Sequence, residues 1–252
     1  MGFWKYNINS ETDDAKTTLA HRDIIKRKRF LNNLYREWYI ESLRRINPSE
    51  EGKIIEIGSG GGFIKEVYPN VITSDVQKFE HCDECFCAEK MPFEDGEIKG
   101  IFMINVLHHI QNCSKFFEEV DRVLHTNGKL IMIEPANTFF SRLIYKHIHH
   151  EIFDSQANWM IETGGRLSRS NIALPWIIFF RDKEQFNQRY KNLELKNVQI
   201  HTPFRYLLSG GVLMKAFVPA SSFGFFSIIE KMLNPVMKYI GMFMTLEIVK
   251  KN

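Results

Sequence analysis

A carboxylate followed by a glycine-rich stretch is the part of this sequence most suited to chemistry. Residues 56–62 read EIGSGGG, directly after an apolar run. A strand that turns sharply into a helix here would present bare backbone to a ligand at its glycines, so the segment predicts a nucleotide-like site. The glycines concerned are Gly58, Gly60 and Gly62. Phe63 stands where a dinucleotide fingerprint needs Gly or Ala, which disfavours NAD. Glu56 would repel a diphosphate and attract ammonium and sulfonium groups, so the pattern predicts a cationic ligand.

Histidine and acidic residues form two further clusters with possible proton-transfer chemistry. His108 and His109 follow an apolar run, and residues 145–156 read YKHIHHEIFDSQ. Histidine exchanges a proton near neutral pH, so either cluster could supply a general base, and the second could also bind a metal. We take His109, His150 and Glu151 as candidate catalytic residues. A structural role for the His108–His109 pair remains open.

The cysteines have zinc-like spacing but lack the rest of a zinc site. His81, Cys82, Cys85 and Cys87 contain one C-x-x-C pair, with no second pair elsewhere in the sequence. Two of these cysteines fall on a predicted strand, where small apolar residues pack. We therefore predict no metal site and read the cysteines as reduced thiols of a cytoplasmic protein. The net charge of +3 gives no electrostatic footprint for nucleic acid, so no nucleic-acid partner is expected.

Short β-rich runs alternate with helical segments along most of the chain, which predicts an α/β fold with a parallel sheet and crossover helices. An amphipathic helix is expected over 17–46, before Asn47-Pro48. The expected strands are 53–58, 70–76, 84–89, 99–106, 129–135, 192–202 and 241–251.

Two connections in this pattern are too long to be ordinary loops. Both would leave from the C-terminal edge of the sheet, where open α/β folds bind ligands, so we predict that they form a mostly helical cap. The predicted organisation is an N-terminal helical lid (1–48), a ligand-binding core (49–135), a cap insertion (136–191), strand six (192–202), an apolar cap insertion (203–240) and the last strand (241–252).

Several segments, in their order along the chain, resemble the motifs of the class I S-adenosylmethionine (SAM)-dependent methyltransferases. EIGSGGG is similar to the family's E/D-x-G-x-G-x-G motif. AEKMPFEDGEIKGIFMINVLHHI (88–110) resembles its A-E-x-L-P-F and V-L-H-H segments, and FFEEVDRVLHTNGKLIMIEP (116–135) resembles its fourth helix and fifth strand. Within the family the chain looks similar to the small-molecule, ubiquinone-biosynthesis-like group. The resemblance departs at Cys87, where the family often has an acid, and at Asn127, where it usually has Pro.

This resemblance implies a fold, a cofactor and a set of binding residues. The fold would be a Rossmann-like, mostly parallel seven-stranded sheet in the order 3-2-1-4-5-7-6, with helices on both faces. The cofactor would be S-adenosyl-L-methionine. Asp75, 19 positions after Glu56, would accept the ribose hydroxyls, and Glu89 or the backbone near Ala88 would meet the adenine. The implied cofactor-binding residues are Glu56, Gly58, Gly60, Gly62, Asp75, Ala88, Glu89, Met91 and Asn105.

The implied activity is in-line methyl transfer, and the expected acceptor is a small or lipid-linked molecule such as a sugar, a glycolipid or a quinone-like ring, methylated on oxygen. Residues 204–243 are rich in Phe, which suits a greasy acceptor or peripheral membrane contact. RNA methylation and SAM binding without catalysis remain as alternatives.

Overall fold

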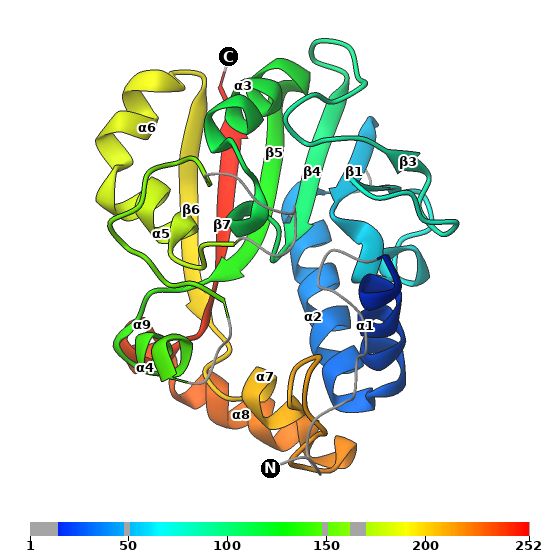
Figure 1. The fold of residues 1–252 in the computed structure, drawn as a ribbon, viewed down its shortest axis with the longest axis vertical. Helices are drawn as coiled ribbons and strands as arrows, with labels where there is room; N and C mark the ends of the chain where they lie inside the picture. Colours follow the sequence, from blue (N-terminus) through cyan, green and yellow to red (C-terminus); the bar gives the residue numbers. More distant parts are fainter. Residues whose placement is uncertain (1–14, 48–50, 148–150, 162–169, 252) are drawn as a thin grey trace.

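The computed structural model describes residues 15–47, 51–147, 151–161 and 170–251, and these contain one seven-stranded sheet. Its order is β3-β2-β1-β4-β5-β7-β6, as predicted (Figure 1). The strands are β1 (Lys53–Ile57), β2 (Ile72–Asp75), β3 (Glu84–Cys85), β4 (Ile98–Ile104), β5 (Leu124–Pro135), β6 (Leu193–His201) and β7 (Phe243–Lys250). The first five are parallel, and β7 runs antiparallel between β5 and β6. The sheet therefore has the architecture of the Rossmann-like methyltransferases.

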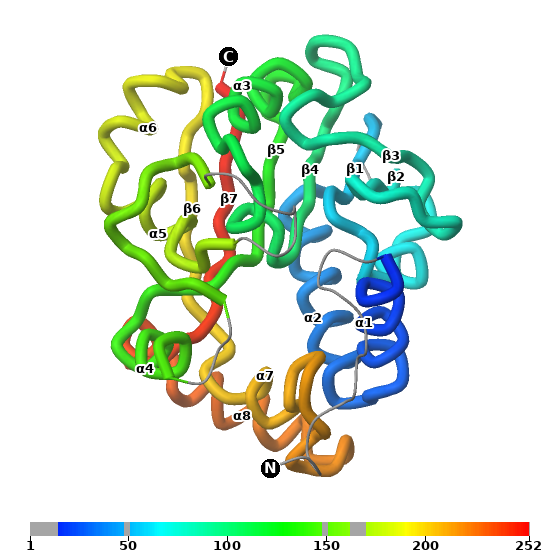
Figure 2. Tube along the Cα trace, in the orientation of Figure 1, coloured from blue at the N-terminus to red at the C-terminus, as the bar shows by residue number. Residues whose placement is uncertain are grey.

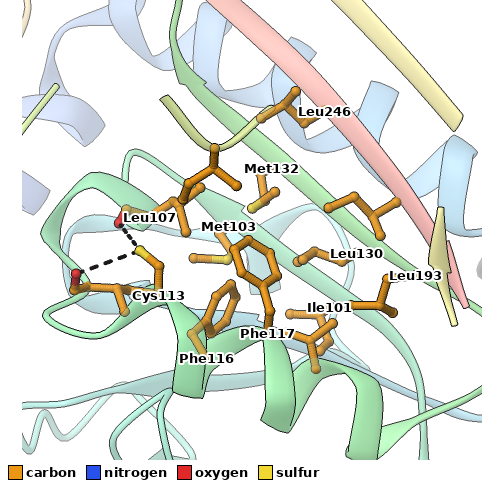
Figure 3. Packing of buried hydrophobic residues seen from close by; sticks show 14 of the residues in the cluster. Ile101, Met103, Leu107, Cys113, Phe116, Phe117, Leu130, Met132, Leu193 and Leu246 are labelled. Carbon is orange, nitrogen blue, oxygen red and sulfur yellow. Dashed lines mark hydrogen bonds between the residues drawn. The ribbon is translucent and has the colours of Figure 1, made fainter. Parts of the chain in front are cut away.

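Helices cover both faces of the sheet, because alternate side chains of each buried strand point to opposite sides. On one face, Met103 and Leu130 pack against α3 (Cys113–Val123). The helices α5 (Leu174–Trp176) and α6 (Lys183–Arg189) contribute to the same hydrophobic cluster. Figure 3 shows Phe116 and Phe117 of α3 within this cluster. On the other face, Phe102 packs against α2 (Arg29–Ile46). Glu56 alternates with apolar neighbours on β1.

The N-terminal helical segment differs from the single helix predicted over 17–46. It forms α1 (Ala15–Arg27) and α2, which are separated at Lys28 with φ −81° and ψ 89°. The Lys28 ammonium is buried and donates hydrogen bonds to the carbonyl oxygens of Gly211 and, at 2.8 Å, Met214. A side-chain bond to a distant loop thus coincides with the break, and helical periodicity carries no trace of it.

The helix predicted directly after the glycine-rich turn is not formed in the described residues. Two 3-10 turns, η1 (Ser59–Gly61) and η2 (Ile64–Glu66), take its place. Only five residues lie between Phe63 and Pro69, and β2 begins at Ile72. This connection is too short to hold an α-helix and still return the chain to the start of β2.

The two long connections place helices beside the C-terminal end of the sheet. After β5 comes α4 (Phe139–His147), and after β6 come α7 (Arg205–Ser209), η5 (Ala220–Ser222), α8 (Phe223–Met232), η6 (Asn234–Val236) and α9 (Met237–Ile240). In Figure 2 the segment with α7 and α8 runs between α4 and the α1–α2 pair. The division of the chain into lid, core and cap insertions stays a prediction.

A buried ionic cluster fastens this segment to the N-terminal helices. Arg205 donates from Nη1 and Nη2 to the two carboxylate oxygens of Glu37 on α2, each at 2.7 Å, and from Nε to Glu230 on α8 at 2.5 Å. Arg205 and Glu230 are almost fully buried. In the part of the chain that the structure describes, no helix combines the length and the apolar character needed to cross a bilayer.

Candidate functional site

One cavity of about 650 Å³ lies at the C-terminal ends of β1, β2, β4 and β5, the edge at which parallel α/β sheets bind ligands. The glycine-rich turn and Asp75 line one part of it. The cap segment from Tyr206 to Met214 and the end of α4 line another part, and α1 contributes from a third side. Segments far apart in the sequence therefore share one site.

Glu56 is a buried carboxylate with unused hydrogen-bonding capacity. It lies near the end of β1, is 3% exposed and lines the cavity. Its Oε2 atom has no hydrogen-bond partner among the described residues. The pKa of Glu56 is raised to about 7, mainly because burial penalises the charged carboxylate. A buried acceptor without a partner is rare and suits a cationic donor supplied by a ligand.

The glycine-rich turn is built so that side chains would not fit. Gly58 has φ 77°, and a Cβ there would lie 2.4 Å from Cγ2 of Val106. A Cβ at Gly62 would lie 2.7 Å from the hydroxyl oxygen of Tyr39. Gly58 and Gly62 line the cavity; Gly60 is buried beside it and donates its N–H to Oδ2 of Asp75 at 3.0 Å. Bare backbone therefore faces the ligand space.

Asp75 is held in place at the C-terminal end of β2. Besides the bond from Gly60, its Oδ1 accepts the backbone N–H of Gln77 at 2.9 Å. Burial raises the pKa of Asp75 above its ordinary value, partly offset by these backbone donors. A fixed carboxylate that lines the cavity can accept hydrogen bonds from vicinal hydroxyls.

The remaining predicted cofactor residues divide between the cavity wall and the core. Ala88, Glu89 and Asn105 line the cavity. Glu89 accepts the backbone N–H of Asn112 at 2.9 Å, and Asn105 has φ 55° with its side-chain oxygen buried. Met91 is 3% exposed and packs in the hydrophobic cluster below α3, away from the cavity wall.

His108 lies between two carboxylates. Its Nδ1 is 2.6 Å from Oε2 of Glu134, and its Nε2 is 3.5 Å from Oε2 of Glu151. Glu134 is fully buried and also accepts the backbone N–H groups of Val106 and Leu107 at 2.8 and 2.7 Å. Burial alone would lower the pKa of His108, but the two carboxylates outweigh it and raise the pKa to about 10.

Of the three predicted catalytic residues, the structure brings two together. His109 and Glu151 both line the cavity, with Nε2 of His109 3.9 Å from Oε1 of Glu151. His150 lies outside the described residues. The sequence offers His108 only as a possible base or structural residue beside His109, and Glu134 is missed. Glu134 could have been found from its position, because it lies next to the end of a buried strand as Glu56 does.

The fold and site together define the class. A sheet in this order with one antiparallel strand, and acids near the ends of β1 and β2 beside a glycine-rich turn, are the features of a class I SAM-dependent methyltransferase. Residues 55–132 match the family model described as "Methyltransferase domain". The chain therefore carries a class I SAM-dependent methyltransferase domain, whose cofactor is S-adenosyl-L-methionine.

Comparisons with individual proteins agree with this. The chain is 33% identical over 89 residues to a sterol 4-C-methyltransferase from Caenorhabditis elegans, covering 34% of this chain and 25% of that protein. It is 26% identical over 157 residues to a highly reducing polyketide synthase from Pyricularia oryzae, covering 46% and 6%. The chain thus spans a quarter or less of these relatives.

A SAM-dependent methyltransferase from Thermotoga maritima has the same fold. Its crystal structure superposes with a TM-score of 0.50 at 17% identity, covering 91% of this chain and 99% of that one. Membership of the ubiquinone-biosynthesis-like group stays a prediction.

Proposed function

We propose that the protein is an O-methyltransferase for a small or lipid-linked acceptor bound beside the cofactor. The observation that supports this is the lining of one continuous cavity. Its cofactor end carries Glu56, the glycine-rich turn and Asp75, and its cap end is mainly apolar. Cap-end residues are Ile144, Tyr145, Ile172, Leu207, Val212, Leu213, Met214, Met242 and Phe243. An apolar wall of this kind selects an acceptor with a greasy portion.

The residues at the cofactor end fit S-adenosyl-L-methionine. Glu56 would bind its ammonium group, the bare backbone of the turn would lie against it, and Asp75 would accept the ribose hydroxyls. Glu89 and the backbone at Ala88 would meet the adenine, with Asn105 beside the amino-acid part and Met91 supporting the wall from the core. The cofactor supplies an electrophilic methyl group. The protein aligns the acceptor with it and excludes water, which can provide about 7 to 11 kcal/mol in favourable cases.

A hydroxyl acceptor must also lose its proton, and His109 and Glu151 are the candidates to receive it. They lie together on the cavity wall between its two ends. General-base assistance contributes roughly 10² to 10⁴ in rate. The name of the Caenorhabditis relative, a sterol methyltransferase, supports a lipidic acceptor.

We further propose that the protein is cytoplasmic and reaches its acceptor at a membrane, which one face of α8 and α9 would contact. Large apolar side chains are exposed there: Phe225, Ile228, Met232, Val236 and Tyr239. The one acid in residues 204–243, Glu230, is buried against Arg205, so the exposed Lys231 and Lys238 leave α8 and α9 with a positive charge. An apolar face with cations suits an anionic bilayer.

The acceptor class is tested with radiolabelled SAM. Wild-type protein is incubated with the lipid, small-molecule, RNA and protein fractions of a cell extract, and the Glu56→Gln variant serves as a control with weakened cofactor binding. At a SAM concentration near the wild-type Kd, we expect label in an organic extract with wild type and much less with the variant. Label in RNA alone would contradict the proposal.

Membrane contact is tested by vesicle co-sedimentation. We expect binding to vesicles containing anionic phosphatidylglycerol, weaker binding to phosphatidylcholine alone, and loss of binding in the Phe225→Ser/Ile228→Ser variant. Leu19→Ser removes an exposed apolar side chain from α1 and should have no effect. Equal sedimentation of all three proteins would refute the membrane contact.

A further inference from the structure

We propose that His108, His109 and Glu151 form a binding site for a divalent transition metal ion, with Zn²⁺ the best match, on the acceptor side of the cavity. Within the described residues, no other group of three or more His, Cys, Asp and Glu side chains is gathered closely enough to hold an ion. The sequence predicts no metal site, because the cysteines lack a second C-x-x-C pair and sequence spacing alone does not fix the geometry of the histidine and acidic residues. These ligands come from η3 (Leu107–His109) and from the loop after α4.

The distances between the ligand atoms suit one ion. The three atoms all lie within 4.8 Å of one another. Nε2 of His108 is 3.5 Å from one oxygen of Glu151, and Nε2 of His109 is 3.9 Å from the other. Ligands about 2.1 Å from a tetrahedral zinc ion lie about 3.4 Å from each other. Small side-chain rotations would therefore complete the arrangement.

Glu134 supplies the second layer of contacts that metal-binding histidines usually have. Its Oε2 lies 2.6 Å from Nδ1 of His108, so the Nδ1–H is the donor and Nε2 is directed to Glu151. Metal-ligating histidines generally donate their other ring N–H to a carboxylate or carbonyl in this way. The bonds from the N–H groups of Val106 and Leu107 fix the Glu134 carboxylate in turn.

The charge of the cluster and the type of its ligands indicate which metal ion it would bind. Glu134 and Glu151 bring two negative charges to the cluster, so a dication with two neutral imidazoles leaves it neutral. Imidazole ligands favour zinc and its transition-metal neighbours, whereas Mg²⁺ and Ca²⁺ prefer oxygen. Two histidines and one carboxylate with an open position is also the ligand pattern of catalytic zinc.

The open position gives the metal a role that rests on the proposed function. All three ligands line the cavity, so the acceptor oxygen could occupy that position. Coordination would acidify the acceptor hydroxyl: its O–H bond breaks, the electron pair stays on the oxygen, and the proton leaves to solvent. Lewis-acid activation would then replace direct proton transfer to His109 and Glu151.

Metal binding is tested without reference to activity. Chelator-treated full-length protein is titrated with Co²⁺, whose visible absorption reports coordination, and then with Zn²⁺. We expect one equivalent to bind, no sulfur-to-cobalt charge-transfer band, and displacement by Zn²⁺. Glu151→Gln and His109→Asn should each weaken metal binding at least about tenfold. Both variants should keep the wild-type circular dichroism spectrum, because neither side chain holds Glu134 in place. His125→Asn changes a partly exposed histidine on β5 and should bind the metal as wild type does.

The outcomes separate this inference from the proposed function. An absence of saturable binding, or binding that both ligand variants retain, would overturn the metal site. Methyl transfer that continues unchanged in chelated protein would overturn the metal's role and leave the O-methyltransferase proposal standing. Stoichiometric binding lost in both variants supports the site even if no lipid or small-molecule acceptor is ever labelled.

Discussion

Replacing Glu56 by Gln should weaken cofactor binding and at the same time stabilise the ligand-free protein. The carboxylate is buried with one oxygen lacking a partner, and its pKa is raised from 4.5 to about 7. At about 1.4 kcal/mol per pKa unit, the charged form of Glu56 destabilises the folded state by about 3 kcal/mol above pH 7. The amide must itself give up hydrogen bonds to water, so the expected net gain is about 2 kcal/mol.

The pH dependence follows from the same shift. The folded protein holds a proton on Glu56 between about pH 4.5 and 7 that the unfolded chain has lost. This contribution to stability therefore falls as pH rises through that range and is constant above it. In urea unfolding, the gain in unfolding free energy of Glu56→Gln over wild type should grow as pH rises from 5 to 7 and stay constant from 7 to 8, because other groups such as His201 contribute equally to both proteins. The matched variant Glu66→Gln, a surface acid on η2, should show no such pH-dependent difference from wild type.

Replacing Glu56 by Gln should weaken SAM binding, although it stabilises the ligand-free protein. A charge-assisted hydrogen bond to the cofactor ammonium is worth about 1.5 to 3 kcal/mol, so Glu56→Gln should raise the Kd for SAM about 10- to 150-fold. Methylthioadenosine lacks the ammonium group and should bind both proteins equally. At pH 6, calorimetry in buffers of different ionisation enthalpy should detect release of about one proton per SAM bound by wild type and none by the variant.

Either of two results would contradict the proposed contact between Glu56 and the ammonium group of SAM. If Glu56→Gln binds SAM as tightly as wild type, the carboxylate does not meet the ammonium. If the variant weakens SAM and methylthioadenosine by the same factor, the substitution has disturbed the turn as a whole.

Three further predictions address other parts of the fold. Burial and nearby arginines lower the pKa of His201 to about 3. The contribution of His201 to the unfolding free energy should therefore fall by up to about 1.4 kcal/mol per unit as pH drops below 6.5, measured as the difference between wild type and His201→Asn in urea titrations. Arg205→Met leaves Glu230 buried without its partner and should cost about 3 to 5 kcal/mol by urea unfolding, with much of the loss recovered in Arg205→Met/Glu230→Met. Gly58→Ala would place a methyl group 2.4 Å from Val106 at positive φ and should cost about 1 to 3 kcal/mol, seen as a lower Tm; an unchanged Tm would contradict it.

The sheet could be predicted because its central strands are short apolar runs, and the first two are followed or ended by a glycine or an acid. The runs ending near Glu56 and Asp75 are examples, and their order in the chain matched one known sheet topology. The two helices around Lys28 could not be predicted, because the break coincides with a side-chain bond to carbonyls more than 180 residues away. Periodicity reports only local preferences.

The site was predictable where its residues lie close together in sequence and was missed where folding assembles it. Residues 56–62 carry the motif and its function together. His108 and Glu134 meet across 26 positions, and only the parallel pairing of β4 with β5 shows that they are neighbours. Met91 stays a predicted cofactor residue, and contacts with α3 hold its segment: Glu119 accepts its N–H and Arg122 donates to its carbonyl oxygen.

Lys28 joins two walls of the cavity, since it sits between the N-terminal helices and its ammonium holds the carbonyls of Gly211 and Met214. For the spent nucleoside to leave, these two walls would have to separate, and the two hydrogen bonds from the Lys28 ammonium would have to break. We therefore expect dissociation of the demethylated product, rather than the chemical step, to limit turnover. An enzyme of this kind would be slow, ordered in its kinetics and sensitive to inhibition by its own by-product.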